Sequence, residues 1–247
     1  MVINNFDKIK GLLEFEEGKF YNLQILRRRK DGNTFVGSNL VKSYVIDSWE
    51  KLLSFKQEIV SICNALNARA YIDVCRRDFR TVAHQLNLKN TELFYKGNYE
   101  AMGNTYLSVA MKYRDNEMWV VDIDTLDEGF INEVVEKVNS CRSKFSTVVE
   151  KIIPTVSGVH LITHPFNRTE FATLYEKTTT DIVTVHKCSM TLLYFDSGEN
   201  PFKRKPQLTD FYDGLDPRGC SGREYDDYLE ALDEWKQSIE EKATTHD

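Results

Sequence analysis

Apolar and polar positions along the N-terminal part of the chain repeat with strand and helix periods in turn. Two strands, a helix, a third strand and a second helix are expected, in this order: 20–29, 34–46, 48–67, 68–75 and 77–88. The Asp31-Gly32 step between the first two strands is typical of a hairpin turn. Ser48 can cap the first helix, whose apolar residues recur at intervals of three and four.

A second series of elements follows residue 105. The stretch 105–112 is apolar but ambiguous between strand and helix. The pattern then predicts strand, helix, strand, strand, helix and two closing strands, in this order: 117–125, 128–145, 146–156, 158–164, 167–178, 181–187 and 190–196. Strand–helix–strand–strand–helix–strand is the split-βαβ order of ferredoxin-like folds. The sequence therefore predicts an α+β protein.

Three segments are expected within one compact domain. Residues 1–104 form an N-terminal α/β unit, and 105–197 form the split-βαβ unit. Residues 198–222 are rich in Pro and Gly and read as a loop. The remainder, to residue 247, carries an amphipathic helix with a stripe of Tyr, Leu and Trp, which is expected to pack on the body.

Charge is distributed unevenly along the chain. The net charge is −6, and residues 223–247 alone hold nine acids and three bases, so the preceding 222 residues are neutral overall. Short basic clusters occur at 27–30, 76–77 and 203–205. Such clusters suit a polyanion held locally, without the strong field of a nonspecific DNA-coating protein.

Several protein classes are disfavoured by composition. No apolar run reaches the ~18–20 residues that a membrane span needs, and the N-terminus does not resemble a signal peptide. The five cysteines are scattered and form no Cys-x-x-Cys pair, so buried free thiols are expected rather than disulfides or a zinc ribbon. A cytoplasmic protein without membrane contact is expected.

Two aspartates end the apolar strand at 118–125. Asp122 and Asp124 are spaced one apart, so a strand would point both side chains to one side. Two neighbouring carboxylates repel each other unless a cation lies between them or one is protonated. Further along, Ser157, Gly158 and His160 enter a strand, and Asp181 precedes another strand that ends in Lys187. Carboxylates suit Mg²⁺ or Mn²⁺, while a histidine and a lysine suit nucleotide phosphates.

These segments resemble the catalytic motifs of archaeo-eukaryotic primases, the primase-polymerase superfamily. Val120-Val121-Asp122-Ile123-Asp124 resembles the first motif, Gly158-Val159-His160 the second, and Asp181 with Lys187 and Leu193-Tyr194 the third. The resemblance covers about residues 105–196, and Gly158 stands where the family often has Ser. It implies a primase-polymerase-type fold with an RRM-like catalytic sheet.

The resemblance also implies roles for individual residues. Asp122, Asp124 and Asp181 would hold Mg²⁺ or Mn²⁺, with Asp196 as the rival third carboxylate. The nucleotide would contact a second set: Ser157, Gly158, His160 and Lys187. Apart from the resemblance, weaker phosphate or nucleic-acid contacts are expected from three arginines in or next to the strand at 68–75: Arg69, Arg76 and Arg77.

The expected activity is template-directed nucleotidyl transfer for primer synthesis or extension in DNA replication. Its partners would be a nucleic-acid template and primer, nucleoside triphosphates and a replicative helicase. Two alternatives stay open. One is a nucleic-acid-binding replication-accessory module with a degraded site, and the other is a different metal-dependent phosphoryl enzyme such as a nuclease.

Overall fold

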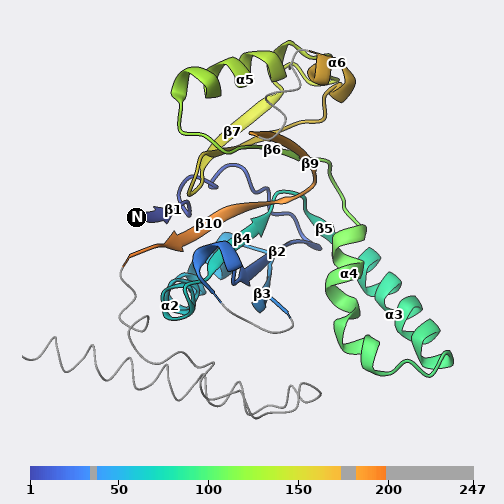
Figure 1. Ribbon diagram of the computed structural model, residues 1–247. Helices are drawn as coiled ribbons and strands as arrows, with labels where there is room; N and C mark the ends of the chain where they lie inside the picture. The colour runs from blue at the N-terminus through green and yellow to red at the C-terminus, as the bar shows by residue number, and fades with distance from the viewer. Residues whose placement is uncertain (34–37, 174–181, 199–247) are drawn as a thin grey trace, which may run out of the picture. The chain divides into compact units, whose positions relative to one another are not determined.

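The computed structural model describes residues 1–33, 38–173 and 182–198 (Figure 1). The chain divides into two compact units, Met1–Gly198 and Glu199–Asp247, and only the first is described below. The expected amphipathic helix, the loop before it and Asp181 lie outside the described residues.

A six-stranded sheet forms one part of the first unit. Its strand order is β1-β10-β4-β2-β3, with β5 paired to β2, and all neighbours are antiparallel. The strands are β1 Val2–Asn4, β2 Lys19–Leu26, β3 Leu40–Ile46, β4 Arg69–Asp73, β5 Arg77–Asp78 and β10 Met190–Asp196. The antiparallel pairing expected across Asp31-Gly32 is confirmed, since β2 pairs with β3, and Gly32 adopts the left-handed conformation with φ 82°. Glycine adopts this conformation without a steric penalty. The strands end at Leu26 and resume at Leu40, so the connection is longer than the expected turn at 30–33.

Helices accompany this large sheet. They are α1 Trp49–Ser54, α2 Lys56–Leu66, α3 Phe79–Tyr95 and α4 Thr105–Lys112, with 3₁₀ turns η1 Arg29–Asp31 and η2 Glu100–Asn104. Ser48 caps α1 by accepting a hydrogen bond of 3.2 Å from the amide of Lys51, as expected. The single helix expected over 48–67 is interrupted at Phe55. The ambiguous stretch 105–112 is helical because Val109 and Ala110 are buried against Val82 of α3.

A four-stranded antiparallel sheet forms the other part of the unit. Its strands are β6 Trp119–Ile123, β7 Val149–Pro154, β8 Val159–Thr163 and β9 Val183–Lys187, and its helices are α5 Glu128–Ser140 and α6 Arg168–Thr173. The spatial order is β7-β8-β6-β9. The β6-α5-β7-β8-α6-β9 sequence has the expected split-βαβ order. The two antiparallel sheets with their helices confirm the α+β class.

The small sheet is apolar on the face that α5 and α6 cover (Figure 1). Trp119, Val121 and Ile123 of β6 are buried in one core with Ile131, Val134 and Val138 of α5. Because side chains alternate along a strand, Val120 and Asp122 lie on the opposite face. This alternation decides which residues of β6, β8 and β9 can form a site.

The expected boundaries at 104 and 197 assign two segments to the second unit that belong with the large sheet in the structure. Helix α4 packs with α3, beside the large sheet. Strand β10 pairs with β1 and β4 in the large sheet, whereas the pattern grouped it with the second unit. The chain turns sharply at Cys188, whose φ is 47°, so β9 and β10 enter different sheets within a few residues.

The two sheets are joined by hydrogen bonds as well as by the chain. The buried Asn5 side chain donates from Nδ2 to the carbonyls of Pro154 on β7 and Leu192 on β10, both at 2.9 Å. The four cysteines that the structure describes are buried free thiols, as expected. Within the described ranges, no helix combines the length and apolarity needed to cross a bilayer.

Candidate active-site cleft

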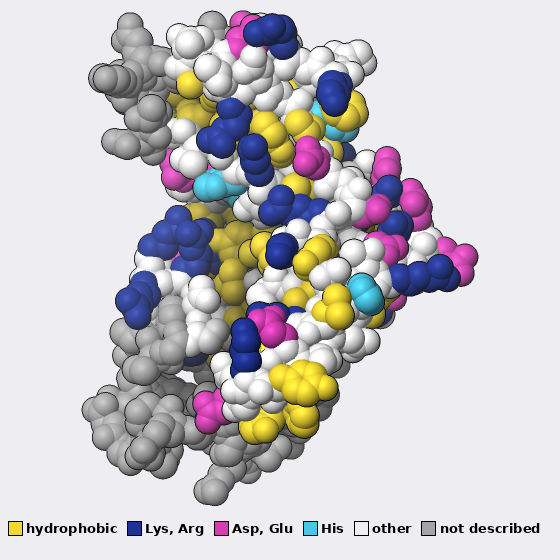
Figure 2. Space-filling view, turned by 90° about the vertical axis from the view of Figure 1, so that its right-hand side faces the viewer, with side chains coloured by type: hydrophobic (Ala, Val, Ile, Leu, Met, Phe, Trp, Pro, Cys, Tyr) yellow, Lys and Arg dark blue, Asp and Glu magenta, His cyan; other side chains and the backbone are white. Residues whose placement is uncertain are grey.

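A cleft of about 270 Å³ lies between the two sheets. The small sheet contributes Val120, Asp122, Asp124, Thr155, Ser157, His160 and His186, and the opposite wall contributes Leu26, Arg28, Lys30, Asn39, Arg69, Tyr71, Ser189, Met190 and Leu192. In Figure 2, Lys and Arg side chains gather along one side of a hollow in the surface, and a His side chain lies on the other side. The cleft therefore has one acidic and one basic wall.

Asp122 and His160 meet on the small-sheet wall. They are direct cross-strand partners in the β6–β8 pairing, so their side chains leave the sheet on the same face. His160 Nε2 lies 3.4 Å from Asp122 Oδ1. The other ring nitrogen, Nδ1, lies 3.0 Å from the hydroxyl of Thr191 on β10. The imidazole thus connects the carboxylate to the large sheet.

Asp124 has a similar partner from the turn before β8. The Ser157 hydroxyl donates a hydrogen bond of 2.8 Å to Asp124 Oδ1. The chain can bring these two residues together because Gly158 has no side chain. A Cβ on Gly158 would lie 1.8 Å from the carbonyl oxygen of Ile123. Each aspartate of the pair is therefore contacted by a donor from the motif that contains Ser157 and His160.

The surroundings of Asp122 favour its ionised form. Burial alone would raise the pKa of this carboxyl. The hydrogen bond from His160 and the charges of His160, His186 and Lys30 outweigh burial, so the pKa of Asp122 lies below its ordinary value. The repulsion expected between the two aspartates is thus offset by neighbouring donors and positive charge.

The basic wall is held in place by the turn after β2. Arg69, on β4, donates from Nε to Asp31 Oδ2 at 2.7 Å and forms a second contact with Oδ1. Arg69 also stacks on the Phe195 ring, with its guanidinium carbon 4.5 Å from the ring centroid. This buried ion pair fixes the turn from which Arg28 and Lys30 reach the cleft. Arg69, one of the three weakly expected contacts, lines the cleft with Asp31 as its partner.

Lys187 is not brought to the cleft. It pairs with Trp119 in the β6–β9 register, and its Nζ lies 5.2 Å from the centroid of the Trp119 ring, on the face that α5 covers. His186, one residue earlier, pairs with Val120 and lines the cleft. Because side chains alternate along β9, the cleft is lined by His186 and not by the expected Lys187.

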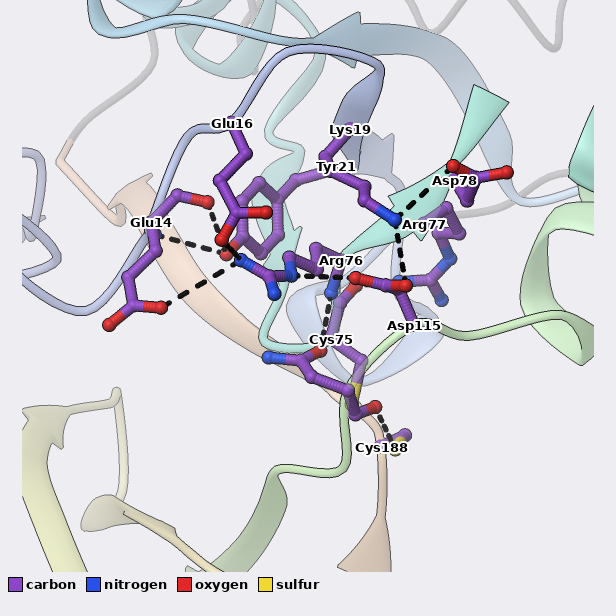
Figure 3. Close-up of polar contacts among 11 residues, drawn as sticks. Glu14, Glu16, Lys19, Tyr21, Cys75, Arg76, Arg77, Asp78, Asp115 and Cys188 are labelled. Carbon is purple, nitrogen blue, oxygen red and sulfur yellow. Dashed lines mark hydrogen bonds and ion pairs between the residues drawn. The ribbon is translucent and has the colours of Figure 1, made fainter. Parts of the chain in front are cut away.

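Arg76 and Arg77 are also placed away from the cleft. Arg76 points among carboxylates (Figure 3), with Asp115 at 2.9 Å and Glu16 at 2.6 Å. Arg77 is fully buried, pairs with Asp73 at 3.1 Å and donates to the carbonyl of Ala110 at 2.8 Å. The expectation that Arg77 contacts phosphate is wrong, because its guanidinium has no exposed surface. The sequence could not reveal this, since consecutive arginines usually lie on a surface.

The third carboxylate has two sequence candidates. Asp181 lies outside the described residues. Asp196 ends β10, and the cleft-lining residue of this strand nearest to it is Leu192, so Asp196 lies about 13 Å further along the strand. It pairs with Val2 and accepts a hydrogen bond of 2.7 Å from the amide of Gly198. The structure thus separates Asp196 from the other carboxylates. Across the described ranges, no three His, Cys, Asp or Glu side chains are grouped as metal ligands would be.

The sequence reasoning missed part of the cleft. Arg28 and Lys30 belong to the basic cluster at 27–30, and this cluster is the sequence signal for them. Tyr71 accepts a hydrogen bond of 2.9 Å from Arg28 Nη1, and no sequence pattern indicated it. His186 could have been found from strand alternation only with the register of β9 against β6 known.

Comparisons with known proteins found no relative of this chain. The chain matches no protein-family model, no curated protein and no solved structure.

Proposed function

We propose that this chain is a metal-dependent primase-polymerase that transfers nucleotides to a primer along a nucleic-acid template. The proposal includes a primase-polymerase-type arrangement in which the split-βαβ unit carries the catalytic groups. One observation carries it: Asp122 and Asp124 share a cleft with Ser157 and His160, and Arg28 and Lys30 line the same cleft. A nucleoside triphosphate with a divalent ion has the charges that such a cleft would accept.

The donor set fits Mg²⁺ or Mn²⁺. Asp122 and Asp124 offer carboxylate oxygens on one wall, and these ions prefer oxygen ligands. Asp122 would be ionised, because its pKa is lowered. Asp181 would be the third ligand. When bound, the ions would activate the primer 3′-hydroxyl and stabilise the leaving pyrophosphate.

The remaining residues would bind and orient the nucleotide. His160 and Ser157 now contact Asp122 and Asp124, and these same groups would donate hydrogen bonds to triphosphate oxygens. Gly158 would serve by letting the Ser157 turn approach β6. His186 would take the phosphate-binding role expected of Lys187. Arg28 and Lys30 would bind phosphates of the nucleotide or template from the opposite wall.

The test is nucleotide incorporation on a labelled primer annealed to a longer template. The purified chain is incubated with nucleoside triphosphates and Mg²⁺ or Mn²⁺, and strand length is read on a gel. We expect extension that requires metal and template and that is lost in Asp122→Ala. Full incorporation by Asp122→Ala would refute the proposal. Deoxynucleotides and ribonucleotides are supplied separately to identify the product.

A second candidate is a replication-accessory module that binds nucleic acid without catalysis. The position of Lys187 on the far face of the sheet favours it, because one element of the third motif is then missing from the cleft. Isothermal titration separates the two candidates: the polymerase binds Mn²⁺ and nucleotide together, whereas the module binds only nucleic acid. In the incorporation assay, a labelled strand that becomes shorter with metal would instead indicate a nuclease.

We propose the cytoplasm of a bacterial or phage-infected cell as the setting of this activity, with a replicative helicase as partner.

A further inference from the structure

We infer that Thr191 is a positioning residue for the proposed reaction, because its hydroxyl orients the His160 imidazole so that Nε2 faces the cleft. The role in the reaction rests on the proposed function. The orientation itself rests only on the geometry of the two side chains.

The contact joins the two sheets behind the cleft. Thr191 lies on β10 of the large sheet and is fully buried. Its hydroxyl oxygen is 3.0 Å from Nδ1 of His160, while Nε2 of the same ring is 3.4 Å from Asp122 Oδ1. Since Thr191 is buried, it cannot touch a substrate directly. Any effect on the reaction must pass through the imidazole.

Strand pairing alone does not fix this ring. The register places His160 opposite Asp122 and so sets the positions of the two Cβ atoms. The outer torsion of histidine is broad and roughly two-fold, so two ring orientations related by 180° are available. In the flipped orientation, carbon atoms would face both the Thr191 hydroxyl and Asp122. The observed orientation is the one in which both ring nitrogens have partners.

The two contacts of the ring together select the tautomer. The Thr191 hydroxyl can donate or accept, whereas the ionised Asp122 carboxylate can only accept, so the proton of the neutral ring is on Nε2 and Thr191 donates to Nδ1. A hydrogen bond to one ring nitrogen commonly determines the role of the other in this way. Nε2–H then faces Asp122, and in the proposed reaction it is available to a phosphate oxygen. Thr191 thus holds the ring in the orientation in which His160 is a donor toward the cleft.

The chain offers a matched control for this hydroxyl. Thr163 is also a fully buried strand threonine, three residues after His160 on β8. Its hydroxyl has no hydrogen-bond partner within the part of the chain that the structure describes. Thr163→Val therefore makes the same chemical change as Thr191→Val without removing a contact to the ring.

The first test reads the ring without any activity. Nitrogen-15 spectra of the imidazoles are recorded under alkaline conditions, in which the neutral rings show their tautomer, and His160→Gln assigns the His160 signals. We expect the Nε2–H tautomer in the wild type, in Thr191→Ser and in Thr163→Val, and a tautomer mixture in Thr191→Val. A wild-type ring protonated on Nδ1 would overturn the inference, whether or not any variant folds. An unchanged tautomer in folded Thr191→Val would also overturn it.

The second test separates this inference from the proposed function. In the incorporation assay, Thr191→Val is expected to raise the nucleotide KM about tenfold, the effect of losing one hydrogen bond to a charged group, with a smaller change in kcat. Thr191→Ser should restore the wild-type KM, and Thr163→Val should leave it unchanged. A wild type that incorporates no nucleotide would refute the proposed function. An active Thr191→Val with wild-type KM would refute the positioning role alone.

Discussion

A Cβ atom on Gly158 would lie 1.8 Å from the backbone carbonyl oxygen of Ile123 and 2.7 Å from the amide nitrogen of Thr125. The turn before β8 therefore touches the strand end that carries Asp122 and Asp124, with backbone against backbone. This close approach is what allows Ser157 to reach Asp124.

Gly158→Ala should disrupt the cleft, because the atoms that the new methyl group meets belong to the backbone and cannot rotate away. We expect loss of nucleotide incorporation and a free energy of unfolding lower by about 1–3 kcal/mol, as for overpacked sites. Gly103→Ala is the control, since a Cβ there meets nothing within 4 Å. Urea unfolding and the primer assay measure both effects. Wild-type behaviour of Gly158→Ala would show that the turn does not pack as described.

Asp122→Asn should abolish incorporation while leaving the fold intact. Losing a metal-binding carboxylate is expected to reduce the rate about 100-fold or more. The amide oxygen of Asn can still accept a hydrogen bond from His160, so the free energy of unfolding should fall by less than about 1.5 kcal/mol. The lowered pKa of Asp122 argues against any gain in stability from relieved carboxylate repulsion.

The control for that variant is Asp127→Asn. Asp127 caps α5 by accepting a hydrogen bond of 3.1 Å from the amide of Phe130, and Asn can cap equally well. It should keep both activity and melting temperature. If Asp122→Asn retains activity, or melts far below the control, Asp122 is a structural residue.

His186 and Lys187 give opposite expectations although they are neighbours. His186→Gln removes a side chain that lines the cleft, so we expect the nucleotide KM to rise about tenfold. Lys187→Met keeps the apolar stem over Trp119 and should leave KM unchanged. Steady-state kinetics on both variants measures the nucleotide KM of each and shows which of the two side chains faces the nucleotide. The reverse outcome would mean that β9 is displaced by one residue when substrate binds.

The buried pair Asp73–Arg77 should make stability depend on pH. Burial raises the pKa of Asp73 to about 6 despite the nearby Arg77. In the unfolded chain this carboxyl loses its proton near its ordinary pKa of about 3.9. Between about pH 4 and 6 the folded state therefore binds more protons, and its free energy of unfolding falls as the pH rises. The fall is about 1.4 kcal/mol for each unit of pKa difference.

The double variant Asp73→Asn with Arg77→Met tests this effect. Removing both charges should be neutral or stabilising above pH 6, because a buried ion pair recovers little of its desolvation cost. Urea unfolding from pH 4 to 7 is compared between wild type and variant. We expect the two curves to separate progressively through the window. Parallel curves would show that Asp73 does not titrate there.

The local sequence was sufficient to predict most of the helices and strands. The pairing of β2 with β3, the Ser48 cap and the apolar stripe of α5 depend on neighbours close in sequence, and each is present in the structure, although the connection between β2 and β3 is longer than expected. The βαββαβ order was readable for the same reason. Strand β10 was grouped with the wrong sheet, because its apolar run is equally suited to either and only long-range pairing with β1 and β4 places it.

The candidate site divides in the same way. The sequence by itself determined that Asp122 and Asp124 end a strand and that Gly158 directly precedes another strand, which contains His160. Strand period and turn chemistry are local, so sequence is sufficient for them. Only the tertiary structure decided that His160 faces Asp122, that His186 rather than Lys187 lines the cleft, and that Arg77 is buried. These outcomes depend on strand register and on which face each sheet buries. A shift of one residue in register moves every side chain of a strand to the other face.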